Sequence, residues 1–189
     1  MRAEMPPRWL PAVLLGLLWV ADAPTWRNRA ARLRHSAQDA GSVRVNNALG
    51  TIGFVAGLVS ALLVPQTLPR SVAWSGAALA VCGMALRCWA IVTLGPLFTL
   101  TIQVRSGQPV VERGPYRWIR HPSYAGADLA LLGIGFCSGH WLPAALFVVP
   151  WVAAHAYRIQ VEERALLATL GDPYARYRER TWRMVPLIW

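Results

Sequence analysis

The order of apolar and polar residues predicts a chain built from membrane-spanning helices. Ala48 to Pro69 carries no charged residue, and Val72 to Leu94 carries only Arg87. Each run is long enough to cross a bilayer core of about 30 Å at about 1.5 Å per residue. Trp9 to Ala23 is a further apolar run, and we expect a retained span there because Trp9 and Trp26 bracket it as interfacial aromatics would. A cleaved signal peptide is the alternative, since Ala21, Asp22 and Ala23 resemble a cleavage site.

Two shorter apolar runs follow in the C-terminal half. Tyr124 to Gly139 and Trp141 to Tyr157 are separated by one histidine, which predicts a tight helical hairpin. Residues 95–122 are rich in Gly, Pro and Arg and are expected to form a loop. Beyond Tyr157, charged and apolar residues alternate as in a helix that leaves the membrane and stops at Gly171. The tail, Tyr174 to Arg183, places arginines between aromatics, as an interfacial helix does.

The runs together predict an all-α integral membrane protein with about five transmembrane helices, including the C-terminal hairpin. Alternating loops place residues 27–47, residues 95–122 and the C-terminal tail on one face, which holds nearly all the arginines. By the positive-inside rule, this face and the C-terminus are cytosolic, and the N-terminus lies outside.

Composition supports this prediction and excludes other classes. Hydrophobic residues make up 55% of the 189 residues and charged residues only 15%, with a mean hydropathy of +0.34. The net charge of +10 does not indicate a nucleic-acid partner, because the arginines lie between apolar runs rather than along one helix face. The cysteines and histidines lack the spacing of a disulfide framework or metal site, so we expect no metal.

The densest unusual stretch is Gly114 to Tyr124, where the loop becomes a membrane helix. His121 falls at or near the N-cap, and Pro122 suits the first helical turn. Unpaired backbone N–H groups at such a helix end attract a carboxylate or phosphate. The alternative is that the arginines and Trp118 only anchor the helix among lipid headgroups.

A second cluster of charges follows the predicted hairpin. Arg158 and Glu162 share one helix face, and Glu163 stands beside them. Charges at a membrane surface are costly to bury, which favours a functional role over a solvated ion pair, although the ion pair stays open. Arg87 and Asp128 lie within apolar runs. Snorkelling is the simpler account of Arg87, Asp128 is a candidate relay or partner for such an arginine, and neither is expected to be catalytic.

Taken together, these motifs resemble the isoprenylcysteine carboxyl methyltransferase (ICMT) family and its phospholipid methyltransferase relatives. The resemblance is carried by Leu86 to Ala90, by GPYRWIRHPSYAG from Gly114 to Gly126, and by the paired glutamates followed by LGDPY and a basic tail. It covers about residues 84–187. We therefore expect a single membrane domain, 1–189, in which residues 1–83 form N-terminal spans and residues 84–189 the catalytic part.

The resemblance implies a cytosolic pocket for S-adenosyl-L-methionine. The residues that it places at the cofactor are Gln103, Gln108, Pro109, Val110, Val111, Tyr116, His121, Pro122, Ser123, Tyr124 and Glu162. It places Arg158 at the substrate, so the expected catalytic residues are Arg158 and Glu162. An acid for the ammonium group of the cofactor and a helix end for its carboxylate agree with the chemistry read from the residues.

The expected function is methyl transfer to a lipophilic acceptor that enters from the lipid bilayer, at the cytosolic face of a bacterial cytoplasmic membrane. The expected acceptor is a carboxylate such as isoprenylcysteine, which needs no deprotonation. A phospholipid amine or a thiol is the alternative within the enzyme class, and it would need a base. A non-enzymatic lipid-binding or transport protein is the alternative from another class.

Overall fold

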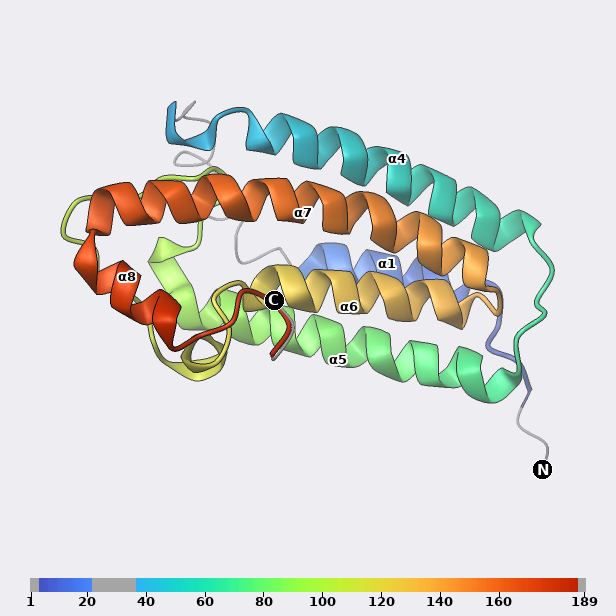
Figure 1. The fold of residues 1–189 in the computed structure, drawn as a ribbon. Helices are drawn as coiled ribbons and strands as arrows, with labels where there is room; N and C mark the ends of the chain where they lie inside the picture. Colours follow the sequence, from blue (N-terminus) through green and yellow to red (C-terminus); the bar gives the residue numbers. More distant parts are fainter. Residues whose placement is uncertain (1–3, 22–36, 187–189) are drawn as a thin grey trace.

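The computed structural model describes residues 4–21 and 37–186, and the regular structure in these ranges is helical (Figure 1). Five helices run side by side: α1 (Leu10–Ala21), α4 (Ser42–Leu63), α5 (Arg70–Leu94), α6 (Pro122–Cys137) and α7 (Trp141–Leu170). The shorter elements are η1 (Ala37–Asp39), η2 (Gly95–Leu97), η3 (Gly114–Arg117) and α8 (Asp172–Glu179). These short elements gather at one end of the bundle, where α8 lies in Figure 1.

Three of these helices are long and apolar enough to cross a membrane, among the residues described: α4, α5 with its η2 extension, and α7. The predicted runs at 48–69 and 72–94 therefore correspond to α4 and α5, although α4 begins earlier, at Ser42. The count of five spans is not confirmed, because α1 has 12 residues and α6 has 16. At about 1.5 Å per residue, α6 measures about 24 Å, which is less than the bilayer core of about 30 Å.

The predicted hairpin is formed by α6 and α7, with Ser138 to His140 between them. Helix α7 continues without a break past Tyr157 to Leu170, so the change of pattern at Tyr157 marks a change of surroundings within one helix. It ends at Gly171, which has a φ of 60° and whose N–H donates to the carbonyl of Leu167. Residues with a side chain disfavour a positive φ, so glycine is the usual residue at such a helix end.

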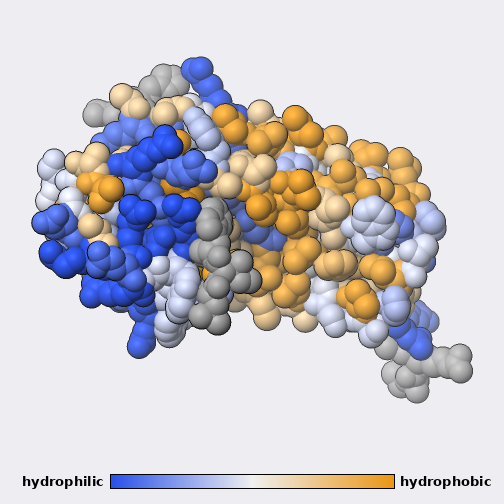
Figure 2. Space-filling view, viewed as in Figure 1, coloured by the Kyte–Doolittle hydropathy of each residue, from blue (hydrophilic) through white to orange (hydrophobic). Residues whose placement is uncertain are grey.

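Hydrophilic side chains gather at the end of the molecule that holds α8, while apolar residues cover the helix bodies (Figure 2). The tail is helical only to Glu179, short of the predicted Arg183. Beyond α8, Trp182 and Arg183 run beside residues 118–121: the N–H of Arg120 donates to Trp182 O over 2.7 Å, and that of His121 to Arg183 O over 2.9 Å. This pairing fixes the chain directly before α6. The arginines expected between residues 27 and 34 lie outside the described residues.

Candidate active site

A cavity of about 720 Å³ lies at the junction of the helix bundle and its polar end. The cavity is lined by five helices, α1, α4, α5, α6 and α7, and by the segments around Leu97–Thr101 and Tyr116–His121. Ligand sites in proteins have volumes of this order. Of the residues that the sequence places at a cofactor or substrate, the cavity is lined by Tyr116, His121, Ser123, Tyr124, Arg158 and Glu162.

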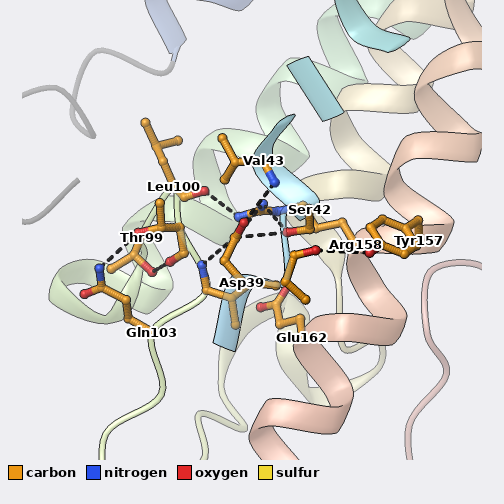
Figure 3. Close-up of polar contacts among 12 residues, drawn as sticks. Asp39, Ser42, Val43, Thr99, Leu100, Gln103, Tyr157, Arg158 and Glu162 are labelled. Atoms are coloured by element: carbon orange, nitrogen blue, oxygen red, sulfur yellow. Dashed lines mark hydrogen bonds and ion pairs between the residues drawn. The ribbon is translucent and has the colours of Figure 1, made fainter. Parts of the chain in front are cut away.

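Arg158 is one of the residues that line the cavity, and it is only 5% exposed (Figure 3). Its Nε donates to the Tyr124 hydroxyl over 2.9 Å, and its Nη1 donates to Ser42 Oγ over 3.0 Å. Its Nη2 donates to the carbonyl of Leu100, and Nη1 lies 3.4 Å from Asp39 Oδ1. The guanidinium therefore joins α7 to α6, to the start of α4 and to the loop after η2.

Asp39 is the carboxylate that compensates this buried cation. Burial by itself would raise the pKa of Asp39, but N–H groups of Val43 and Ile102, the Ser42 hydroxyl and the charge of Arg158 outweigh burial and hold the pKa below its ordinary value. Beside it, Gln38 accepts from Val104 N over 2.8 Å and donates to Val104 O over 3.3 Å. Residues 38 and 39 thus fasten the 100–104 segment along one side of the cavity.

Glu162 stands one turn beyond Arg158 on the same face of α7, and its side chain is 30% exposed. The Tyr124 hydroxyl donates to Glu162 Oε2 over 2.9 Å while accepting from Arg158, so one phenol connects the two predicted catalytic residues. His121 Nδ1 lies 3.8 Å from the same carboxylate oxygen, and the His121 ring stacks on Tyr124 at 5.7 Å between centroids.

Glu163, the neighbour of Glu162, faces away from the cavity and is 4% exposed. Its carboxylate accepts from Arg120 Nε over 2.7 Å and from Arg183 Nε over 3.1 Å. His121 Nε2 is 3.4 Å from Glu163 Oε1, but it is buried without a hydrogen bond of acceptable geometry. Glu163 therefore holds the polar end together, whereas Glu162 remains available to a ligand.

Other residues that the sequence assigns to the cofactor lie apart from the cavity. Pro109, Val110 and Val111 line a second hollow of about 670 Å³, which shares Leu94 and Leu97 with the first. Gln103 donates to Thr101 Oγ1 over 3.1 Å, and the Gln108 side chain accepts from Arg105 N over 3.1 Å (Figure 3 shows Gln103). Pro122 is fully buried at the first turn of α6. The structure thus brings six of the predicted residues together in the lining of the first cavity and leaves the other six outside that lining.

Sequence reasoning missed several residues that line the cavity or support its lining. Asp39 was visible as the lone acid in an arginine-rich stretch, but nothing in the sequence paired it with Arg158, 119 positions away. Arg87 does more than snorkel: it lines the cavity and its Nη1 donates to the carbonyl of Ser123 over 3.0 Å. His155 also lines the cavity, bonded to the buried Asp128. In the described part of the chain, no group of three His, Cys, Asp or Glu side chains is arranged to hold a metal ion.

Comparisons with known proteins find a family whose sequence pattern this chain shares. The sequence model of the isoprenylcysteine carboxyl methyltransferase (ICMT) family matches residues 76–168. An uncharacterized protein of Bacillus subtilis, YpbQ, is 31% identical over 60% of this chain and 67% of its own length. The protein-S-isoprenylcysteine O-methyltransferase of Schizosaccharomyces pombe is 32% identical over 56% of this chain and 46% of its own length. Protein-S-isoprenylcysteine O-methyltransferase B of Arabidopsis thaliana is 32% identical over 60% of this chain and 58% of its own length.

The fold is also that of a solved structure, described as the eukaryotic intramembrane Ras methyltransferase ICMT. The two align with a TM-score of 0.57 and 23% identity, over 75% of this chain and 52% of the other. The chain therefore spans about half the length of the characterized relatives that it matches, and about two thirds of the Bacillus protein. The sequence match, the bacterial relative and the shared helical fold lead to one conclusion: this chain is a member of the isoprenylcysteine carboxyl methyltransferase family.

Proposed function

We propose that this protein transfers a methyl group from S-adenosyl-L-methionine to a lipophilic acceptor that reaches the cavity from the bilayer. The observation that carries the proposal is a single cavity with two unlike ends. Charged and polar residues, Glu162, His121 and Arg87 among them, line the end beside the loops. Leu15, Leu18, Phe54, Leu131 and Trp151 line the end between the helices. A polar cofactor and an apolar acceptor would then meet inside one chamber.

The polar end suits this cofactor in charge and in donor set. Glu162 offers a partly exposed carboxylate for an ammonium group, and Arg87 offers a cation for a carboxylate beside the first turn of α6. His121 lines this end as well, with its Nδ1 3.8 Å from Glu162 Oε2, so a polar ligand held by Glu162 would lie beside the imidazole. When bound, the sulfonium supplies an already activated methyl group. The protein then needs only to align the acceptor and exclude water.

Two acceptor classes have support. A carboxylate such as that of isoprenylcysteine is supported by the names of the relatives and by Arg158, which carries a charge that would hold it. Four of the five N–H groups of Arg158 already donate to described residues, so a carboxylate would find one N–H on Nη2, and a two-bond contact would have to displace the Asp39 or the Leu100 contact. A thiol or amine is the second class, and the His155–Asp128 pair in the cavity wall favours it.

The proposal places the polar end in the cytosol, on the inner side of a bacterial cytoplasmic membrane. Arginines at α8 and in the 105–120 segment stand at this end of the molecule, as the positive-inside rule requires of a cytoplasmic face. S-adenosyl-L-methionine would then reach its site directly from the compartment in which it is made.

Calorimetric titration of the detergent-purified protein with S-adenosylhomocysteine tests the cofactor assignment. We expect saturable binding that Glu162→Ala weakens by about 10- to 100-fold, the effect of a lost hydrogen bond to a charged group. Glu179→Ala on the exposed end of α8 is the matched control and should bind as the wild type does. Folded wild type that does not bind would contradict the proposal and favour a lipid-binding or transport role.

A further inference from the structure

Asp128 and His155 form a buried polar pair that the proposed function has not yet used. Asp128 lies on α6 and His155 on α7, and they are 8% and 3% exposed. The Nδ1 atom of His155 is 2.8 Å from Asp128 Oδ1, while Asp128 Oδ2 is buried without a hydrogen bond. Ionisable side chains in apolar membrane helices are costly, and a functional role is the first hypothesis for them.

The contact with Asp128 determines which ring nitrogen of His155 can accept a proton. An ionised Asp128 can only accept a hydrogen bond, so Nδ1 of His155 is then the donor and Nε2 is the acceptor nitrogen. His155 lines the cavity, and none of the described residues hydrogen-bonds its Nε2. A carboxylate behind one imidazole nitrogen, with the other nitrogen facing a ligand site, is the arrangement of a general base.

The location of His155 is where a cofactor and an acceptor would meet. Its ring stacks on Tyr124, with centroids 4.7 Å apart, and lies 5.2 Å from the Trp151 ring. Tyr124 bonds to Glu162 and Arg158 at the polar end, whereas Trp151 belongs to the apolar end. On α7, His155 lies about one turn before Arg158 and on the same face.

The charges around the cavity further narrow the chemical class of the acceptor. Arg87, Arg120 and Arg158 line the cavity, and Glu162, the acid among its described lining residues, is already proposed to hold the ammonium group of the cofactor. An ammonium acceptor would therefore meet an excess of positive charge. A carboxylate acceptor has no proton to lose and would leave the base unused. Among neutral acceptors, a thiol has a reference pKa of about 8.5, closer to that of imidazole than a phenol at about 10. A thiol also loses less hydration than a hydroxyl on entering an apolar chamber.

We propose that His155, oriented by Asp128, is the base that deprotonates a lipophilic thiol in this cavity. The proposal rests on the proposed function, for which it names the acceptor class. In the proton transfer, the S–H bond breaks, its electron pair stays on sulfur and the proton forms the N–H bond of His155 Nε2. Asp128 stabilises the resulting imidazolium, and the proton leaves to water by way of the polar end of the cavity. The thiolate is then the nucleophile that receives the methyl group.

The test compares two acceptors and two variants in detergent micelles. Dodecanethiol is the thiol probe, and N-acetyl-S-farnesylcysteine is the carboxylate probe. His155→Gln removes the base, and Asp128→Asn keeps the hydrogen bond but favours the wrong tautomer. His140→Gln, in the turn before α7 and remote from the cavity lining, is the control histidine variant. Size-exclusion chromatography and S-adenosylhomocysteine titration confirm that each variant folds and keeps its cofactor site.

We expect the wild type and His140→Gln to methylate dodecanethiol, with kcat at least 100-fold lower in His155→Gln and about 10- to 100-fold lower in Asp128→Asn. A second readout needs no cofactor: ultraviolet absorbance should show more thiolate for dodecanethiol bound to the wild type than to His155→Gln. S-adenosylhomocysteine affinity should stay within about twofold in both variants, because neither residue is among the predicted cofactor contacts and the acceptor side of His155 carries the proposed role.

Two results would overturn the assignment while leaving the proposed function in place. One is a wild type that binds S-adenosylhomocysteine but methylates only the farnesylcysteine probe, or neither probe. The other is a folded His155→Gln that methylates dodecanethiol as fast as the wild type. Loss of S-adenosylhomocysteine binding in the wild type is the separate result that would remove the proposed function itself.

Discussion

The two helix pairs on either side of the cavity are packed in different ways. Between α5 and α6, backbone lies on backbone: a Cβ added to Gly83 would be 2.6 Å from the carbonyl oxygen of Gly126, and one added to Gly126 would be 2.7 Å from Arg87 N. Between α4 and α7, a Cβ on Gly53 would also meet backbone, Leu146 O at 3.0 Å, but rings fill the space over the other two glycines. A Cβ on Gly57 would meet Phe147 Cδ1 at 2.5 Å, and one on Gly50 would meet Trp151 Cζ2 at 2.7 Å.

This difference shows which wall of the cavity is fixed and which can adjust. Small residues that let two backbones approach closely are typical of tight helix pairs in membranes. Such a pair has no side chain that could move aside, so α5 and α6 hold Arg87 and Ser123 in one geometry. The α4–α7 interface includes rings with rotatable bonds. We infer that adaptation to acceptors of different size occurs on that side.

The largest effect is expected from placing a side chain in the fixed wall. Gly83→Ala should lower the free energy of unfolding by about 3 kcal/mol, because the new methyl group meets backbone atoms and two helices must separate. Titration with sodium dodecyl sulfate in mixed micelles measures the change. Gly16→Ala, which has nothing within 4 Å, is the control and should leave stability unchanged or slightly higher. A Gly83→Ala variant as stable as Gly16→Ala would contradict a fixed α5–α6 pair.

A medium effect is expected at the polar contact between the start of α4 and α7. Asp39→Asn should cost about 2 kcal/mol at neutral pH, because Arg158 and two backbone N–H groups lose a charged acceptor. The folded pKa of Asp39 is below its unfolded value, so this stability is complete above about pH 4 and is lost as the pH falls through the folded pKa.

Thermal unfolding midpoints of wild type and Asp39→Asn, measured from neutral pH downward, test this dependence. The difference between the two proteins should be constant down to about pH 4 and then shrink. A difference that grows toward acid pH would mean that Asp39 is not the acceptor of these bonds.

The smallest effect is expected in the adjustable wall. Gly57→Ala should cost about 1 kcal/mol, because the Phe147 ring can shift and alanine favours the helix. The same detergent titration as for Gly83→Ala measures it. The comparison between the helix pairs fails if Gly57→Ala destabilises as much as Gly83→Ala does.

How much the sequence reveals differs between these regions as well. Uncharged runs locate α4 and α5, and the histidine between two apolar runs locates the turn of the α6–α7 hairpin, because length and polarity are local properties. From the sequence alone, the part of α7 after Tyr157 looks like a separate helix. The reason is that a helix passing from lipid into a polar environment changes its composition while its backbone hydrogen bonds continue.

The site was predictable only in part. The residues from Tyr116 to Tyr124 and on α7 come together because each set is local to one turn or one helix face. The Asp39–Arg158 and Asp128–His155 contacts join positions far apart in the chain, and nothing within either segment specifies the partner. The position of residues 108–111 beside the second hollow could not be predicted either, because where a loop lies depends on the helices around it.

The length of α7 has a consequence for the membrane around the protein. Its 30 residues extend about 45 Å, about 15 Å more than a typical hydrocarbon core. If the exposed Trp141 marks one lipid interface, Glu162 lies about 31 Å further along the helix, close to the opposite interface. In a thicker bilayer, lipid tails would surround Glu162, and in a thinner one the cavity would stand further into water. Acyl-chain length would therefore set how deep the cavity lies, and on the proposed function the rate of methyl transfer should depend on the lipid species in which the protein is reconstituted.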